Sequence, residues 1–297
     1  MTTTQPQFPG VLAATTTPFN RDHEIDLDAF AEHCGWLIGE GVHGLVPCGS
    51  LGEYETMTDD ERSATLAVAA EVSKGRAQFV PGVAGKSARE AVRWTRRAAE
   101  LGADGVMCLP PTSHSPTGDE VVAHFTEVAA VGLPVIAYNN PFSTRVDLTP
   151  PLLARLAEIG GVAGVKEFSQ DVRRVAQIQE QAPSLEVLVG CDDLLAEGVL
   201  MGATGWIAGF VNAFPSQSVR LFDLASKGPW NDALPLYRAM LPALRWDAMP
   251  EFVQAIKLGQ EEAGRYGGPV RLPRLPLSAA DEARARREVR AALTATS

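Results

Sequence analysis

Residues 134–169, PVIAYNNPFSTRVDLTPPLLARLAEIGGVAGVKEFS, contain the pattern that decides the fold. The stretch begins and ends with a short apolar run, PVIAYNNP from Pro134 and VAGVKEFS from Val162. Between the two runs lies an amphipathic stretch that is led by proline and has helical character. A strand, a helix and a second strand in this order form a βαβ unit, which places its two strands parallel in one sheet.

The same alternation of an apolar run and an amphipathic stretch continues through most of the chain. Several of the helical stretches have recognisable starts, such as the capping box from Thr58 to Glu61 and the openings at Ser87 and Asp171. Repetition of the βα unit predicts a parallel sheet with helices outside it. We find eight apolar runs, VLAATTTPF from Val11, GLVPCG from Gly44, AQFVPGVA from Ala77, GVMCLPP from Gly105, PVIAYNNP from Pro134, VAGVKEFS from Val162, LEVLVGCDD from Leu185 and ATGWIAGF from Ala203.

The number of units predicts an α/β fold with a (β/α)8 (TIM) barrel and a C-terminal helical appendage. Eight units of about 25 residues fill a barrel over residues 1–226. Residues 227–297 then form a tail of three helices, which begin near Trp230, Pro250 and Ser278. The last helix has many charges of both signs, which indicates a solvated face with ion pairs between residues four apart. A partner-binding face is the alternative interpretation of that helix.

Composition excludes several classes of function. The chain has 297 residues, of which 45% are apolar, so it can bury a large core. Its formal net charge of -10 argues against nucleic-acid binding, which requires a cationic surface. The start MTTTQPQFPG lacks the features of a secretory signal, and no apolar run reaches the roughly 18 residues of a membrane span. We therefore expect a cytoplasmic protein with no nucleic-acid or membrane partner.

The cysteines give no sign of a disulfide framework or a zinc site. Cys34, Cys48, Cys108 and Cys191 are widely spaced and form no CxxC pair. We expect them to be reduced, mostly buried small residues.

Lys166 stands out because it lies late in the sixth apolar run. Active sites of (β/α)8 barrels form at the carboxyl ends of the strands, where this lysine would lie. Burial lowers the pKa of an amine, and only the unprotonated amine attacks a carbonyl to form a Schiff base. The alternative is a lysine whose amine reaches solvent or pairs with Glu167 or Asp192.

Two further segments end strands of the same predicted barrel. Tyr138 lies late in the fifth run, where a phenol facing the barrel axis could transfer protons during imine chemistry, although strand tyrosines are usually ordinary core residues. The CGSLGE turn, residues 48–53, closes the second run. Gly49 and Gly52 would let its amide groups approach a carboxylate. The alternative is a turn without a ligand, in which Glu53 only caps the next helical turn.

Together these segments resemble the dihydrodipicolinate synthase/N-acetylneuraminate lyase superfamily of Schiff-base-forming lyases over about residues 10–226. The superfamily's GTTGE-type turn matches GSLGE at 49–53, and its YNxP motif matches YNNP at 138–141. Its KE pair matches residues 166–167, and its glycine-plus-acid segment matches 190–193. The helical tail is also expected in this superfamily.

The resemblance implies a role for each matched residue. Lys166 would form the imine with a 2-oxo acid, and Tyr138 would shuttle protons. Ser50 would connect that tyrosine to a hydrogen-bonded relay, and the backbone amides of Ser50 and Leu51 would hold the substrate carboxylate. These roles place the chemistry at the predicted barrel mouth.

The resemblance also implies the remainder of the pocket and the assembly. Gly190 and Ile207 would line the pocket on its far side. Neither a metal nor an organic cofactor is implied, because the protonated imine is itself the electron sink. Members of the superfamily usually form a homotetramer built as a dimer of dimers.

Three departures from true dihydrodipicolinate synthases bear on the substrate. Those enzymes have two threonines in the turn, where this chain has Ser50 and Leu51. They carry paired tyrosines after the fourth strand, one of which crosses a subunit interface, where this chain has PPTSH at 110–114 with His114 last. They carry an arginine after YNxP, where this chain has Ser143, a substrate-binding candidate, and Arg145 two places further on. Lysine biosynthesis therefore becomes the less favoured activity.

The favoured activity is that of a catabolic dehydratase, deaminase or aldolase. The chain resembles members that act on 1-pyrroline-4-hydroxy-2-carboxylate or on 2-keto-3-deoxy sugar acids. Two alternatives stay open at this point. One is 4-hydroxy-tetrahydrodipicolinate synthase, which condenses pyruvate with a semialdehyde, and the other is a barrel that binds a small ligand without turnover.

Overall fold

The predicted (β/α)8 barrel is confirmed by the computed structural model, which describes residues 7–296. All eight strands are parallel, in the order β3-β2-β1-β8-β7-β6-β5-β4. The two ends of this sheet meet through a parallel bridge between Gly82 and Met107, where Met107 N donates to Pro81 O at 3.0 Å and Val83 N donates to Met107 O at 2.9 Å. The strands are β1 (Gly10–Ala14), β2 (Gly44–Val46), β3 (Gln78–Phe79), β4 (Val106–Cys108), β5 (Val135–Asn139), β6 (Val162–Glu167), β7 (Glu186–Val189) and β8 (Gly205–Ala208).

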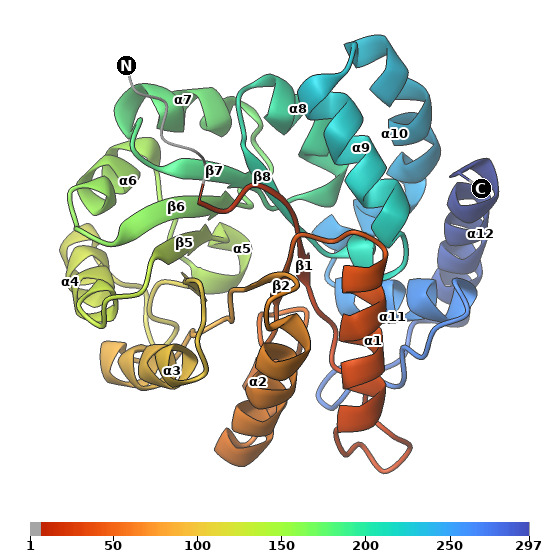
Figure 1. The fold of residues 1–297 in the computed structure, drawn as a ribbon, viewed down its shortest axis with the longest axis horizontal. Helices are drawn as coiled ribbons and strands as arrows, with labels where there is room; N and C mark the ends of the chain where they lie inside the picture. Colours follow the sequence, from red (N-terminus) through yellow and green to blue (C-terminus); the bar gives the residue numbers. More distant parts are fainter. Residues whose placement is uncertain (1–6, 297) are drawn as a thin grey trace.

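The helices of the barrel surround the strands (Figure 1). At Thr58 the predicted capping box is confirmed, because Thr58 Oγ1 accepts from Glu61 N at 3.2 Å and Glu61 Oε2 accepts from Thr58 N at 2.8 Å. Ser87 caps its helix as predicted. The helices are α1 (Leu27–Gly39), α2 (Asp59–Ser73), α3 (Ala88–Glu100), α4 (Gly118–Ala129), α5 (Pro141–Thr144), α6 (Pro150–Ala157), α7 (Arg173–Gln181), α8 (Leu195–Leu200) and α9 (Pro215–Lys227).

The predicted tail helices are present as α10 (Trp230–Leu244), α11 (Phe252–Glu262) and α12 (Ala279–Thr296). They gather beside α9 and α1 (Figure 1). The 3₁₀ helix η4 (Arg245–Ala248) connects α10 to α11 and contacts a second one, η2 (Asp192–Leu194), which follows β7. The tail therefore reaches the end of the barrel at which the strands finish. The division into a barrel over 1–226 and a tail over 227–297 stays a prediction about folding units.

Ion pairs cover the last helix, as its sequence predicts. Arg286 pairs with Glu282, and Arg284 pairs with Glu288, both four residues apart within α12. Arg286 and Arg290 also pair with Glu262 of α11, which joins the two helices.

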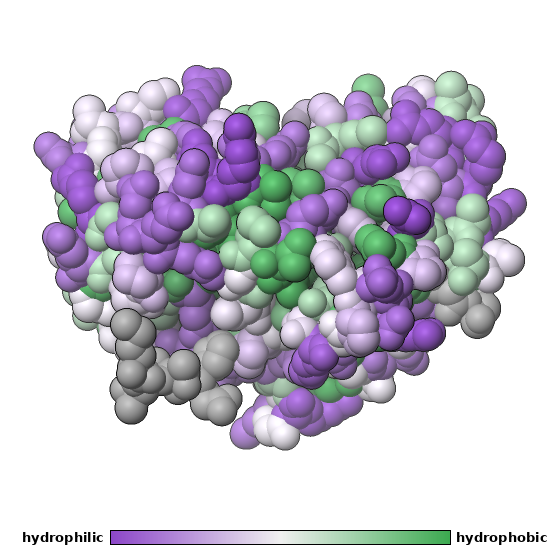
Figure 2. Space-filling model, turned by 90° about the horizontal axis from the view of Figure 1, so that it is seen from above, coloured by the Kyte–Doolittle hydropathy of each residue, from purple (hydrophilic) through white to green (hydrophobic). Residues whose placement is uncertain are grey.

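The face of the molecule in Figure 2 is mainly hydrophilic, with apolar residues in small groups. None of the helices within residues 7–296 combines the length and apolar character needed to cross a membrane.

The register between β5 and β6 positions the two residues of greatest interest. Tyr138 pairs with Lys166, so the side chains of these neighbours lie on the same face of the barrel wall. The Lys166 amine lies 4.4 Å from the centre of the Tyr138 ring. The four cysteines are unpaired and buried, as predicted.

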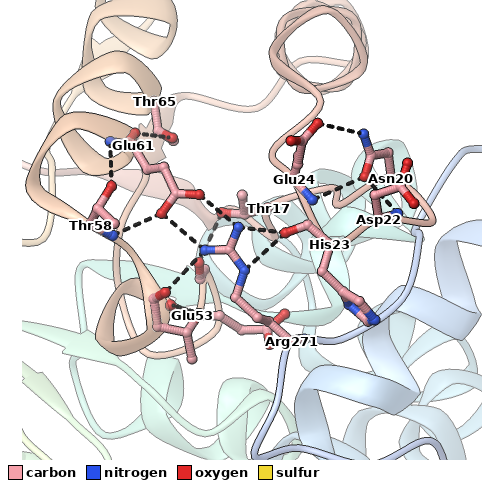
Figure 3. Close-up of polar contacts among 12 residues, drawn as sticks. Thr17, Asn20, Asp22, His23, Glu24, Glu53, Thr58, Glu61, Thr65 and Arg271 are labelled. Atoms are coloured by element: carbon pink, nitrogen blue, oxygen red, sulfur yellow. Dashed lines mark hydrogen bonds and ion pairs between the residues drawn. The ribbon is translucent and has the colours of Figure 1, made fainter.

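A polar network around Arg271 ties the tail to the barrel (Figure 3). The Arg271 guanidinium donates to both carboxylate oxygens of Glu61, at 2.7 and 3.0 Å, and to the carbonyl oxygens of His23 and Thr56. Its backbone N–H donates to Glu53 Oε2 at 3.0 Å. The other Glu53 oxygen lies 2.8 Å from the amine of Lys257 in a fully buried ion pair. Loss of one partner of such a pair typically costs about 3–5 kcal/mol.

Candidate active site

A cavity of about 540 Å³ opens where the strands end. The predicted site residues Lys166, Tyr138, Ser50, Leu51 and Gly49 all line it, and so does Ser143. The tail completes the wall from the other side. The remaining lining residues are Ala14, Met107, Asn140, Phe142, Phe168, Gln170, Gly209, Asp247, Ala248, Met249, Pro250, Phe252 and Arg274.

Gly190 and Ile207 are not among the residues that line this cavity. Ile207 is fully buried in β8, where it pairs with Leu12 of β1. Gly190 lies against the adjacent strand end, since a Cβ atom there would come within 2.6 Å of the Glu167 carbonyl oxygen. Gly190 thus permits the close approach of two strand ends in this structure.

Lys166 presents an isolated amine to the cavity. The residue is 6% exposed, and its amine has no hydrogen bond or ion pair with any described residue. Its close contacts are the rings of Tyr138 and Phe168, whose centres lie 4.4 and 6.0 Å away. Glu167 points elsewhere and accepts hydrogen bonds from Asn139 and Ser169. Burial lowers the pKa of Lys166, which favours the neutral, nucleophilic amine.

The other lysines of the chain differ from Lys166 in their surroundings. Lys74, Lys86 and Lys227 are exposed on the surface. Lys257 is buried, but Glu53 pairs with it and the Pro269 carbonyl oxygen accepts from it at 2.7 Å. Lys166 is therefore the lysine whose environment suits a nucleophile.

Two buried carboxyl groups face Lys166 from different parts of the chain. Asp192 follows β7, and both its oxygens accept from the backbone of Gly209, with a further bond from Phe210 N at 2.6 Å. Asp247 comes from η4 of the tail and accepts from Asp192 N at 3.3 Å. Burial raises the pKa of Asp192 to about 6 and raises that of Asp247 well above its ordinary value, where the Asp192 charge adds to the effect.

The negative charges of Asp192 and Asp247 oppose the effect of burial on the pKa of Lys166. The charges of Asp247 and Asp192 raise the pKa of Lys166, whereas the larger effect of burial lowers it. Burial is thus the main cause of the lowered pKa of Lys166, and the buried acids reduce that effect to the extent that they are ionised. Over the described residues, no three His, Cys, Asp or Glu side chains gather as a possible metal site.

The Tyr138 hydroxyl is oriented by Asn140. Asn140 Nδ2 donates to the phenol oxygen at 3.1 Å, while Asn140 Oδ1 accepts from Ser143 N at 3.2 Å and so caps α5. Because Asn140 donates, the phenol keeps its own proton available for a partner in the cavity. Burial raises the pKa of Tyr138, which keeps the phenol protonated.

The 49–53 turn presents backbone amides to the cavity. The N–H groups of Ser50 and Leu51 donate to no acceptor among the residues that the structure describes. Two adjacent free amides at a cavity wall suit a carboxylate. Ser50 lines the cavity, but no hydrogen bond joins it to Tyr138 in residues 7–296, where Asn140 is the phenol's partner. Glu53 ends the turn with a φ of 56°, and its carboxylate binds Lys257 and Arg271. The alternative that Glu53 only caps the next helical turn is wrong, because its side chain makes no capping hydrogen bond there.

His114 and Arg145 lie outside the cavity lining. His114 is exposed, with its Nε2 atom 3.6 Å from a carboxylate oxygen of Glu120. Arg145 is exposed beyond α5, with a φ of 58°. Neither side chain therefore contributes a charge to the cavity of this chain.

Comparison with known proteins gives one consistent result. The model of the dihydrodipicolinate synthetase family matches residues 7–295. The chain is 34% identical over 281 residues to the 4-hydroxy-tetrahydrodipicolinate synthase of Methanoculleus marisnigri, covering 93% of this chain and 96% of the relative. It is 33% identical over 270 residues to the enzyme of the same name from Methanosphaerula palustris, with 90% and 93% covered.

Solved structures agree with the sequence match. The 4-hydroxy-tetrahydrodipicolinate synthase of Methylacidiphilum fumariolicum superposes with a TM-score of 0.93 at 27% identity, and 97% of each chain is covered. The dihydrodipicolinate synthase of Aquifex aeolicus gives a TM-score of 0.90 at 27% identity, with 94% of this chain and 96% of that chain covered. The match runs through barrel, cavity and tail, and the chain therefore belongs to the dihydrodipicolinate synthetase family of lyases.

Proposed function

We propose that the protein holds a 2-oxo acid as a Schiff base on Lys166 and makes or breaks a bond beside the imine carbon. The observation that carries this proposal is the buried, unpaired amine of Lys166 next to Tyr138 in the cavity. The free amides of Ser50 and Leu51 support it, because they can hold the carboxylate that neighbours the 2-oxo carbon.

The chemistry follows from these positions. The neutral Lys166 amine attacks C2, and the carbonyl oxygen takes up protons and leaves as water, so a protonated imine forms. Tyr138 supplies and recovers protons, since its hydroxyl hydrogen is free to point into the cavity. Loss of a proton from C3 then gives an enamine. The enamine expels the hydroxyl group from C4, which takes up a proton and leaves as water. In the aldolase alternative, the protonated imine keeps its C3 protons, the C4 hydroxyl loses its proton and the C3–C4 bond breaks, which releases an aldehyde and leaves the enamine on Lys166.

The preferred substrate in this proposal is a hydroxylated 2-oxo acid or its cyclic imine. Candidates are 1-pyrroline-4-hydroxy-2-carboxylate and a 2-keto-3-deoxy sugar acid, which would make the protein a deaminase, dehydratase or aldolase. The hydroxyl at C4 in such compounds provides the leaving group that the enamine needs. A cyclic imine would reach Lys166 by exchange of one amine for another.

A second candidate function is 4-hydroxy-tetrahydrodipicolinate synthase, the name that the relatives bear. Leu51 offers no hydroxyl at the turn, and Ser143 offers no cation where those enzymes carry an arginine. A site built around a polar contact discriminates strongly against a partner that lacks it. The polar differences therefore favour the first candidate.

Substrate preference separates these candidates. We expect kcat/KM for pyruvate with aspartate semialdehyde to be far below that for 1-pyrroline-4-hydroxy-2-carboxylate or 2-keto-3-deoxygluconate, measured in one buffer with N-acetylneuraminate as a further comparison. Missing polar contacts typically cost several kcal/mol, whereas apolar differences cost about 1–3 kcal/mol. A clear preference for pyruvate with the semialdehyde would establish the synthase activity instead. Absence of turnover and of any adduct would favour a ligand-binding barrel.

The pH dependence of imine formation tests the role of Asp247. Because the Asp247 charge raises the pKa of Lys166, Asp247→Asn should lower that pKa further. More of the amine is then neutral at a given pH, so the midpoint of the rate against pH should move downward. The rate is measured by quenching with borohydride at timed intervals. Asp232→Asn, an exposed acid of α10, is the control, and an unchanged or raised midpoint in Asp247→Asn would refute the role.

We also propose a cytoplasmic homotetramer built as a dimer of dimers. The support is the family membership of the chain and the resemblance of its motifs. Light scattering after size-exclusion chromatography measures the assembly directly. A monomer at micromolar concentration would contradict this part of the proposal.

A further inference from the structure

Arg274 is an unpaired cation at the edge of the cavity. Its side chain is half-buried and lines the cavity, yet its guanidinium has no hydrogen bond or ion pair with a described residue. Its only side-chain contact of note is the ring of Phe252, whose centre lies 5.2 Å from the guanidinium carbon. Every other described arginine without a side-chain partner is exposed to solvent. The N–H donors of a guanidinium held at a cavity wall without an anion are free for a ligand, so this arrangement suits an anionic partner.

The segment that carries Arg274 is firmly held. Arg274 N donates to Arg271 O at 3.1 Å, and Arg271 is fixed by Glu61 and Glu53 (Figure 3). The neighbouring cations Arg271 and Lys257 already have carboxylate partners in Glu61 and Glu53. Glu53 and Glu61 are thus engaged with other cations. Arg274 also borders a neighbouring cavity, but its guanidinium lies against the ring of Phe252, which lines the cavity of Lys166.

In the proposed function, the charged and polar groups of the cavity wall contact different parts of the substrate. The charged lining residues within the described chain are Lys166, Asp247 and Arg274. Lys166 receives the 2-oxo carbon in the proposed function, and the amides of Ser50 and Leu51 receive the carboxylate beside it. Arg274 comes from the tail segment after α11 and contacts neither of these two parts of the substrate.

We propose that Arg274 binds a second carboxylate at the distal end of the substrate. The inference rests on the proposed function and narrows its substrate class to 2-oxo acids that end in a carboxylate. Among the candidates above, it selects 2-keto-3-deoxy sugar acids with a second, terminal carboxylate over 1-pyrroline-4-hydroxy-2-carboxylate and 2-keto-3-deoxygluconate, which have one carboxylate each. A guanidinium offers paired N–H groups that match the two carboxylate oxygens, and the Phe252 ring orients its plane. The specificity for the distal end of the substrate is thus supplied by the C-terminal tail.

Matched pairs of acids test this inference. 2-Oxoglutarate and 2-oxoadipate are compared with 2-oxopentanoate and 2-oxohexanoate, which lack the second carboxylate. The measured quantity is the acid concentration that gives half-maximal borohydride trapping. We expect the diacids to require about 10- to 100-fold lower concentrations, the value of a charge-assisted contact. In Arg274→Met, which keeps an apolar chain against Phe252, this preference should disappear, because the half-maximal concentrations of the diacids rise to those of the matched monoacids.

Controls separate this inference from the proposed function. Arg145→Met removes an exposed arginine outside the cavity and should retain the diacid preference. Calorimetric titration of the same acids into Lys166→Ala measures their affinity for the cavity when no imine can form at that position. If the wild type traps no acid, the proposed Schiff base is refuted, and the calorimetric comparison still decides the role of Arg274. Equal calorimetric affinities for diacids and monoacids, or an equal weakening of both by Arg274→Met, would overturn the role of Arg274.

Discussion

Lys166→Ala is expected to abolish both turnover and the trapping of substrate by borohydride. No other described lysine has a buried, unpaired amine, so no residue can replace this nucleophile. The fold should survive, because removing a buried amine relieves its desolvation and leaves only a modest void. The measurements are intact mass after reduction and thermal unfolding of the variant.

Lys86→Ala is the matched control for this prediction. Lys86 is exposed and lies before α3, away from the cavity lining. Its loss should change neither turnover nor adduct yield. Trapping of equal yield in Lys166→Ala and wild type would place the nucleophile elsewhere and remove the basis of the proposed function.

Tyr138→Phe should reduce turnover by about 100- to 10,000-fold, the usual contribution of a general acid–base group. The ring would still pack beside Lys166, but no hydroxyl would remain to move protons to and from the reacting oxygen. Imine formation should become slow yet stay detectable, because the Lys166 amine is still present. Steady-state turnover and the time course of borohydride trapping measure the two effects separately.

Tyr54→Phe provides the comparison for the loss of a buried phenol. Tyr54 is 8% exposed and does not line the cavity, so its replacement should leave turnover close to that of the wild type. A decrease of less than about fivefold in Tyr138→Phe, well below the usual range, would assign Tyr138 to the core instead.

The barrel could be predicted because its signals are local and repeated. The strands lie within apolar runs typical of buried parallel strands, and several helices begin at a recognisable cap, such as Thr58 or Ser87. Position within a run predicts where a site would lie, since residues late in a strand reach the barrel mouth. This rule selects Lys166 and Tyr138 as candidates, and the β5–β6 register places the two side by side.

The tail's contribution to the site could not be predicted from these patterns. Asp247 and Arg274 follow the barrel by many residues and reach the cavity only through the packing of η4 and the loop after α11. No periodic pattern in the sequence distinguishes Asp247 and Arg274 from other polar residues of the tail. The spacing of Tyr138 and Asn140 gives a weak indication of the hydrogen bond between them, because residues two apart at a strand end lie on the same side.

The resemblance to a family predicts the fold more accurately than it predicts some details of the cavity. It placed Gly190 and Ile207 on the pocket wall, whereas the cavity of this structure is lined by Gly209 and Asp247 in addition to the strand-end residues. It linked Ser50 to Tyr138, where the structure has Asn140 as the partner. Side-chain partners depend on the exact neighbours, which differ between members of one family.

Peptide mapping of the reduced adduct identifies the lysine that forms the Schiff base. After incubation with a 2-oxo acid and borohydride, trypsin cannot cleave at a modified Lys166, so the modification should appear on the peptide that spans residues 156–173. We expect the added mass of the reduced acid on that peptide, located at Lys166 by fragmentation. An adduct on another lysine, or an unmodified peptide ending at Lys166 in a sample whose intact mass shows full modification, would show that Lys166 is not the nucleophile.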